Sequence, residues 1–189
     1  MAKIDADANA IPVYEDEAHF QIQTTVTRAW FKRGSAPTVK SLPGRQKVAY
    51  AGFVVPWTGE LHTTKPGRFT YETTIDSIRS FLSARPAKKG KRYAIFMDNA
   101  PWHKKAYRLV QEERRRKYAD IRRAATLELL PPYSPDLNPI EQVWRITRRE
   151  NTHNVFFPSI EKLEETVDAA FKTWRRPNEQ LKSLCQFNK

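Results

Sequence analysis

The sequence lacks the features of a disulfide-stabilised or membrane-spanning protein. Cys185 is the only cysteine among 189 residues, which excludes an internal disulfide and a cysteine-based zinc site and fits a reducing compartment. The longest apolar stretch, Tyr50 to Trp57, is far shorter than the roughly 20 residues that cross a bilayer. The N-terminal residues contain no apolar segment typical of a secretion signal. We therefore expect a soluble cytoplasmic protein with no membrane partner, stabilised by packing.

Negative charge is scarce, and the positive excess is concentrated in one segment. Lysine and arginine number 33 against 21 acidic residues, a net charge of +12. Residues 85–123 alone hold 14 basic and 4 acidic residues. Such a concentration favours a polyanionic partner, nucleic acid first and an anionic membrane surface second, although a solvated basic helix face is an equally good reading of the charge alone. With 40% hydrophobic residues, the chain should fold as one domain over residues 1–189.

The first half of the chain is typical of strands joined by turns. Short β-branched or aromatic segments predict an antiparallel meander of four strands: Ile11–Asp16, His19–Gln23, Arg28–Phe31 and Val48–Val55. A helix is then expected, with Thr73 or Thr74 as its N-cap, ending before Pro86. Residues 85–92 follow as a basic loop. This half should therefore supply most of a sheet.

The second half alternates strands with helices. We expect strands at Tyr93–Met97 and Thr126–Leu130, joined by a basic helix from about Lys104 to Arg123 with a break near Tyr118. A proline-rich loop follows, and then a helix capped by the Asn138 side chain, with Pro139 at its first position and Glu141 as capping-box partner. A C-terminal amphipathic helix should span 159–175. Strand and helix alternation predicts an α/β layer fold.

Three acids stand where such a fold places its functional sites. Asp16 lies at the end of the first strand, Asp98 follows a buried strand, and Glu141 lies in a first helical turn. Converging carboxylates bind hard cations such as Mg²⁺, and paired ions promote phosphoryl transfer. Each acid also has a plain structural reading: a turn at Asp98, a capping partner at Glu141, and a solvated strand end for any of the three acids Glu15 to Glu17.

Three motifs resemble those of a known family. The run Leu130 to Trp144, LPPYSPDLNPIEQVW, closely resembles the signature of bacterial insertion-sequence transposases of the mariner-like DDE superfamily. The run Met97 to His103, MDNAPWH, looks like the family's second-aspartate motif. Tyr14 to Phe20, YEDEAHF, followed by Arg28-Ala29-Trp30 and Gly34, looks like the first-aspartate strand and its successor. The motifs occur in the family's order and span about residues 11 to 150.

The resemblance implies a fold and a reaction. It implies an RNase H-like fold with a central mixed five-stranded sheet flanked by helices. It also implies that Asp16, Asp98 and Glu141 are the catalytic residues and ligands of two Mg²⁺ or Mn²⁺ ions, with Glu17 as the fallback for Asp16. In the family reaction, water attacks a phosphodiester at a transposon end, and the freed 3′-hydroxyl attacks target DNA. The 42 residues between Asp98 and Glu141 are acceptable for bacterial members.

Further residues are expected to support this site. We expect DNA phosphates to contact a set of basic residues: Lys104, Lys105, Arg114, Arg115, Arg116, Arg145 and Arg148. Asn99 and His103 are candidates for orienting the acids, although a turn-shaping asparagine and a plain helix-start histidine are equally good readings. Buried packing is favoured over base stacking for Trp30, Trp57 and Trp102, and Trp144 should lie in the core.

The sequence departs from the family at its N-terminus. Members usually carry helix-turn-helix modules that read the transposon ends, whereas the first predicted strand here begins after about ten residues. We therefore expect the module to be absent, with a separately encoded N-terminal DNA-binding half as a possible partner. A homodimer on DNA in the bacterial nucleoid is the family expectation. The alternatives are a non-catalytic DNA-binding or regulatory remnant and, less favoured, an RNase H-like nuclease unrelated to transposition.

Overall fold

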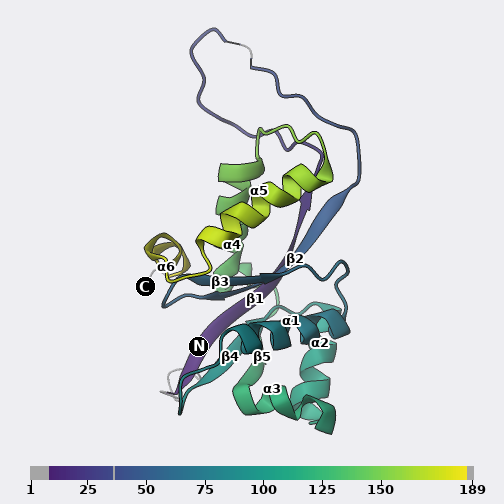
Figure 1. Cartoon of the computed structure of the whole chain (residues 1–189), viewed down its shortest axis with the longest axis vertical. Coiled ribbons are helices and arrows are strands. Elements are labelled where there is room, and N and C mark those ends of the chain that lie inside the picture. The colour runs from purple at the N-terminus through teal and green to yellow at the C-terminus, as the bar shows by residue number, and fades with distance from the viewer. Residues whose placement is uncertain (1–8, 36, 187–189) are drawn as a thin grey trace.

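The computed structural model describes residues 9–35 and 37–186, which form a five-stranded sheet with helices on both sides (Figure 1). The strand order is β3-β2-β1-β4-β5. β1 pairs antiparallel with β2 and parallel with β4, β3 pairs antiparallel with β2, and β5 pairs parallel with β4. The predicted mixed five-stranded sheet flanked by helices is confirmed. The strands are β1 (Ala10–Gln21), β2 (Lys47–Val55), β3 (Glu60–Thr64), β4 (Arg92–Met97) and β5 (Ala125–Leu129).

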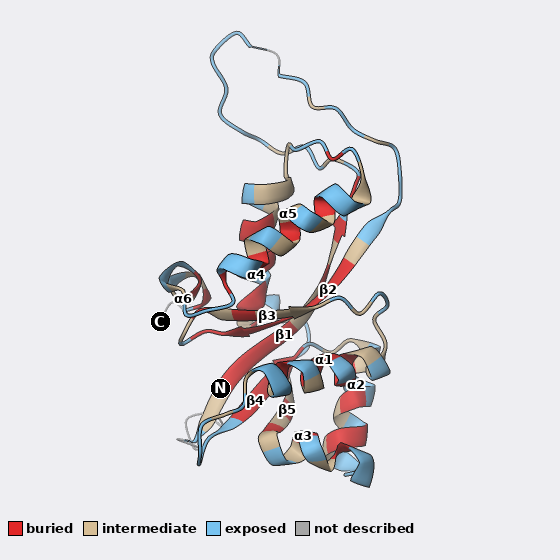
Figure 2. Ribbon diagram, viewed as in Figure 1, coloured by how far each residue is buried: buried red, intermediate tan, exposed pale blue. Residues whose placement is uncertain are grey.

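The helices form two layers, one on each face of the sheet. α1, α2 and α3 cover one face, and α4, α5 and α6 cover the other (Figure 1). Buried residues follow the sheet and the inner sides of both layers (Figure 2). The α-helices are α1 (Tyr71–Ala84), α2 (Pro101–Tyr107), α3 (Ala119–Ala124), α4 (Ile140–Thr147), α5 (Ile160–Thr173) and α6 (Glu179–Cys185). Short π and 3₁₀ turns are η1 (Arg108–Glu112), η2 (Arg116–Tyr118), η3 (Pro135–Leu137) and η4 (Arg148–Thr152).

β1 separates the two hydrophobic cores because successive side chains of a strand point to opposite faces. Tyr14 and Phe20 join the core that α4, α5 and α6 cover, whereas Val13 joins the core beneath α1, α2 and α3. Even-numbered and odd-numbered residues of β1 therefore face different layers. This alternation decides where each of its three consecutive acids points.

Two predictions about the meander are wrong. β1 is one continuous strand rather than two, because β2 pairs with it without interruption from Tyr14 opposite Val54 to Gln21 opposite Lys47. Arg28–Phe31 is not a strand: it lies in the long connection between β1 and β2, and Trp30 there is 101% exposed. The third strand of the meander is instead β3, which the sequence pattern did not predict. The aromatic residues of Arg28–Phe31 did not make it a strand, because a strand also needs a neighbouring strand to pair with.

The helix boundaries also differ from the predictions. α1 begins after Thr70, whose side chain accepts a hydrogen bond from the Thr73 backbone N–H, so neither Thr73 nor Thr74 is the N-cap. The basic helix begins earlier, at Pro101, and breaks before the expected Tyr118, around Arg114 with its positive φ of 49°. α6 was missed. The C-terminal helix is confirmed with Ser159 as its N-cap. Within the described residues, no helix is both long and apolar enough to cross a bilayer.

Candidate active site

The three predicted acids line one open cavity of about 440 Å³. Asp16 comes from β1, Asp98 from the residue after β4, and Glu141 from the first turn of α4. The parallel register brings the first two together, because Tyr14 pairs with Phe96 and each acid lies two residues further along its strand. Lys104 of α2 and the proline-rich loop from Leu130 to Pro135 form much of the remaining wall, together with Asn99, Ala100 and Asn138.

A tryptophan and a glycine set the position of Asp16. The indole Nε1 of Trp144 in α4 donates a hydrogen bond to Asp16 Oδ2 at 3.0 Å. Gly52 of β2 lies opposite Asp16 in the strand register. A Cβ at Gly52 would lie 2.5 Å from Trp144 Cη2 and 3.0 Å from Ile140 Cδ1. The indole therefore reaches Asp16 because residue 52 has no side chain.

The cavity concentrates negative charge. The pKa of Asp16 is raised well above its usual value, first by burial and then by the negative charges of Glu141 and Glu15. The carboxylates of Asp16, Asp98 and Glu141 do not form a group with all ligand atoms within 4.8 Å of one another in the described part of the chain. Like charges in one cavity repel when no cation lies between them. A divalent cation would relieve the repulsion that raises the pKa of Asp16.

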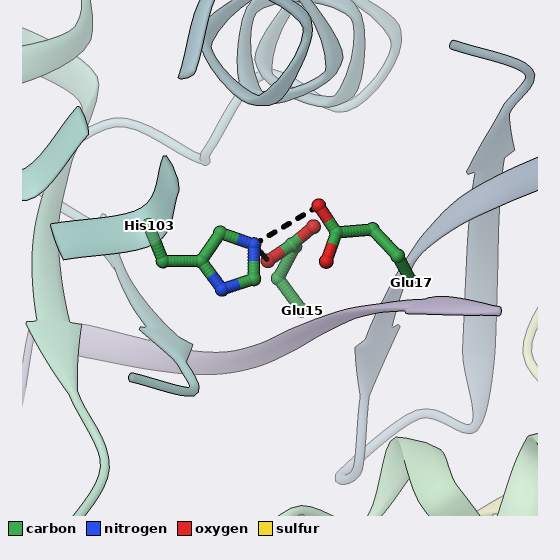
Figure 3. A group of neighbouring side chains, drawn as sticks. All are labelled: Glu15, Glu17 and His103. Carbon is green, nitrogen blue, oxygen red and sulfur yellow. Dashed lines mark hydrogen bonds and ion pairs between the residues drawn. The ribbon is translucent and has the colours of Figure 1, made fainter. Parts of the chain in front are cut away.

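On the opposite face of β1, a buried histidine joins a second group of acids (Figure 3). His103 of α2 lies with Nε2 3.1 Å from Glu15 Oε2 and 3.1 Å from Glu17 Oε1. Its Nδ1 lies 2.5 Å from Asp98 Oδ1. The histidine and Glu15 are fully buried. The imidazole thus connects the odd-numbered acids of β1 with the cavity carboxylate Asp98.

The charges of this group support a protonated histidine. Burial opposes the charge on His103, but the negative charge of Glu15 and the hydrogen bonds that the imidazole donates to Asp98 and Glu17 outweigh it and raise the pKa of His103 well above its usual value. The hydrogen bond from His103 lowers the pKa of Asp98. Burial raises the pKa of Glu15 to about 7. An imidazolium can donate from both nitrogens, so His103 holds Asp98 in its ionised form.

The asparagines beside the acids anchor the proline-rich loop. Asn99 Nδ2 donates to the Leu130 carbonyl at 2.5 Å and ties the start of the loop to the end of β4. Asn138 Nδ2 donates to the Glu15 carbonyl at 3.3 Å and ties the loop's end to β1. The predicted side-chain cap by Asn138 is wrong: α4 begins at Ile140 with Pro139 as N-cap residue and has no side-chain cap hydrogen bond.

The basic residues predicted to contact DNA occupy different surroundings. Lys104 lines the cavity, and the other six are not among its lining residues. Lys105 lies over the Tyr71 ring at 3.8 Å, and Arg148 lies over the Phe20 ring at 5.3 Å and is partly buried. The remaining four, which are exposed, are Arg114, Arg115, Arg116 and Arg145.

Several residues of the site escaped the sequence analysis. The reading of Glu15 as a solvated strand end is wrong, since its side chain is fully buried. Gly52 gave no signal. The positions of both depend on strand register and on which face of β1 each side chain meets. Tyr133 also lines the cavity, and its signal was its place between prolines in the most specific motif. Buried packing proved wrong for Trp30 and Trp57, which are 101% and 60% exposed, and right for Trp144, at 1%.

Solved structures share this fold. The Mos1 strand transfer complex matches with a TM-score of 0.62 at 20% identity, over 97% of this chain and 53% of that chain. The Mos1 mariner paired end complex with Mn matches at 0.61 and 19%, over 97% and 54%. A pre-cleavage Mos1 transpososome matches at 0.60 and 16%, over 100% and 60%. The likeness confirms the RNase H-like fold, and this chain spans little more than half the length of those proteins.

The part of the chain that holds the three acids matches a known family in sequence. No curated protein matches the chain. The model of one family, described as DDE superfamily endonuclease, matches residues 12–164. This range includes Asp16, Asp98 and Glu141, together with His103 and the proline-rich loop. The chain therefore belongs to the DDE superfamily endonuclease family, as its motifs predicted.

Proposed function

We propose that this chain is the catalytic part of a DNA transposase, which cuts DNA at transposon ends and joins the freed ends to target DNA. The observation that carries the proposal is the convergence of Asp16, Asp98 and Glu141, from β1, β4 and α4, on one open cavity. Membership of an endonuclease family supports it. The net charge of +12 suits a DNA substrate, because basic residues neutralise phosphates.

The donor set fits divalent cations. Asp16, Asp98 and Glu141 would hold Mg²⁺ or Mn²⁺, in our proposal two ions, because hard cations prefer carboxylate oxygens. The raised pKa of Asp16 supports this, since its causes include the unneutralised charge of Glu141. When bound, such cations stabilise the negative charge that develops on a phosphodiester under attack.

Neighbouring side chains orient the acids of this cavity and place a positive charge beside them. His103 donates to Asp98 and keeps that carboxylate ionised and oriented. Trp144 orients one oxygen of Asp16 through a neutral hydrogen bond. Lys104, on the cavity wall, is placed to pair with a DNA phosphate. Acids that hold cations and a lysine that attracts phosphate therefore share one opening.

The wider assembly follows from the same function. We propose that the chain acts on paired transposon ends as a homodimer, in the bacterial cytoplasm at the nucleoid, and that a separately encoded N-terminal half can supply end recognition. Structures of Mos1 with paired ends support the pairing of DNA ends in this fold. We propose that exposed basic residues on the connection from α2 to α3, including Arg114 and Arg116, contact the DNA backbone.

The test is metal-dependent cutting of supercoiled plasmid DNA. We expect nicking in Mg²⁺ or Mn²⁺ by the wild type and its loss in Asp98→Ala and Glu141→Gln, with DNA binding retained. Asp136→Asn is the matched control, because Asp136 is an exposed acid of the adjoining turn that does not line the cavity. A wild type that binds DNA but never cuts it with either metal, even with an end-binding partner added, would show a non-catalytic remnant.

A further inference from the structure

Tyr133 differs from the other tyrosines of this protein. Its side chain is 103% exposed, whereas Tyr14, Tyr50, Tyr93 and Tyr118 are buried. Its backbone has a φ of 56°, in the left-handed region that bulky residues rarely adopt. A large apolar ring held in open solvent by an uncommon backbone conformation gains nothing from packing in this chain. Such conformations are concentrated where a ligand is bound.

The ring lies at the rim of the catalytic cavity. Tyr133 lines the cavity with Asp16, Asp98 and Glu141 and is fully exposed, so it borders the opening rather than the floor. A DNA phosphate that reaches the acids carries its sugar and base on the side of the opening. Aromatic rings bind bases by stacking, and this contact tolerates any base because each presents a flat π face.

The loop fixes the ring relative to the acids. Leu130 N–H donates to the Met97 carbonyl at 2.8 Å, directly before Asp98. At the other end of the loop, Asn138 donates to the Glu15 carbonyl, directly before Asp16. Three prolines, Pro131, Pro132 and Pro135, restrict the backbone between these anchors. The position of the ring is therefore tied to the strands that carry two of the three acids.

We propose that Tyr133 stacks on an unpaired base next to the phosphodiester that is cut, and so positions the strand at the acids. The inference rests on the proposed function, since it assigns the substrate contact of the same cavity. Enzymes that act on a base take it out of the stack and hold it between aromatic or apolar side chains, and proteins that bind single strands stack unpaired bases on aromatic rings in the same way. The ring face carries this contact, and the hydroxyl does not.

The experiment measures stacking without cutting. The probe is a forked DNA duplex with 2-aminopurine as the first unpaired base, bound in Ca²⁺, and its fluorescence is quenched when the base stacks. At saturating protein, followed by anisotropy, we expect the wild type and Tyr133→Phe to quench the probe. Tyr133→Ala should lose most of the quenching and bind the fork about tenfold more weakly. Trp57→Ala, which removes an exposed aromatic outside the cavity lining, is the control and should match the wild type.

Three outcomes would overturn the proposal. They are undiminished quenching by Tyr133→Ala, a Tyr133→Phe variant that behaves like Tyr133→Ala, and a wild type that binds the fork without changing the fluorescence. The result is independent of catalysis because the readout needs no cutting. Ring-dependent quenching in a protein that never nicks plasmid would reject the transposase function and keep the base contact. Nicking without ring-dependent quenching would keep the transposase function and reject the base contact.

Discussion

The two faces of β1 carry consecutive acids that do different things. On the even face, Asp16 opens into the cavity and accepts a hydrogen bond from the neutral indole of Trp144. On the odd face, Glu15 and Glu17 lie beside the buried imidazole of His103. The first acid faces an open cavity, which in our proposal admits the cations and the DNA. The other two face a protein cation that already offsets their charge.

The difference is the one that we expect between an acid that binds a cation and an acid that positions its neighbours. Burial raises the pKa of both Asp16 and Glu15. The next-largest effect differs between them: the negative charge of Glu141 raises the pKa of Asp16 further, whereas the positive charge of His103 lowers the pKa of Glu15. An acid destabilised by other acids in an open cavity gains most from an added cation. We expect Glu15 and Glu17, which lie beside His103, to position the imidazole instead.

The largest expected effect comes from exchanging the two kinds of acid for their amides. Asp16→Asn should lower the rate of metal-dependent nicking by about three orders of magnitude or more, because loss of a cation ligand removes several kcal/mol of charge stabilisation. Glu17→Gln should lower it by about tenfold, through weaker support of His103. Nicking rates under single-turnover conditions measure both. The reverse order would make Glu17 the first ligand.

A second prediction concerns only the face of β1 that carries Asp16. Gly52→Ala places a Cβ 2.5 Å from the Trp144 ring, and overpacking of this kind costs about 3 kcal/mol of unfolding free energy. Displacing the indole should also slow nicking by about tenfold, because Asp16 loses its hydrogen bond. Urea denaturation measures the first effect and plasmid nicking the second.

The matched control for Gly52 is another glycine. A Cβ at Gly44 meets Ile22 Cγ2 at 3.6 Å, an ordinary contact, so Gly44→Ala should leave stability and nicking near wild-type values. If Gly52→Ala were as stable and as active as Gly44→Ala, Trp144 could move without harm. Its hydrogen bond to Asp16 would then have no part in positioning the acid.

The sequence was sufficient to predict the three acids of the site, but not the residues that position them. Motif order placed Asp16, Asp98 and Glu141 on elements that meet, because carboxyl ends of parallel strands share one edge of a sheet. Gly52 could not be found, since its role depends on pairing with a residue 36 positions away. The cap prediction at Asn138 failed: its Nδ2 donates to the Glu15 carbonyl, distant in sequence, and its Oδ1 caps no backbone N–H of α4, which begins two residues later. Local patterns cannot weigh such tertiary partners.

A third prediction concerns the pH dependence of stability, which depends on Glu15 on the other face of β1. The pKa of Glu15 is about 7 in the folded protein against a usual value of 4.5. A raised pKa means that its stabilising contribution is complete below pH 4.5 and is lost as the pH rises through 7. In Glu15→Gln this loss is absent, so the fall in unfolding free energy from pH 5 to pH 8 should shrink by about 2 kcal/mol. Urea denaturation across this range measures it.

Asp16→Asn is the comparison variant for the pH series. Its raised pKa has the same sign, so it should also flatten the pH dependence, but it should abolish nicking as well. Glu15→Gln should retain nicking within about tenfold, because Glu17 still accepts from His103. A pH dependence in Glu15→Gln identical to that of the wild type would mean that the buried acid does not titrate in this range.

The smallest expected effect concerns basic residues near the cavity and far from it. Lys104 lines the cavity, whereas Arg116 lies in the η2 turn and does not. Each substitution to alanine should reduce the slope of log binding constant against log salt by about 1, because each removes one phosphate contact. Only Lys104→Ala should also slow nicking at saturating DNA, by about tenfold, since only that lysine adjoins the acids. A slope left unchanged in Arg116→Ala would confine the DNA to the cavity side of α2, and slowed nicking in Arg116→Ala would extend the active site along the whole basic segment.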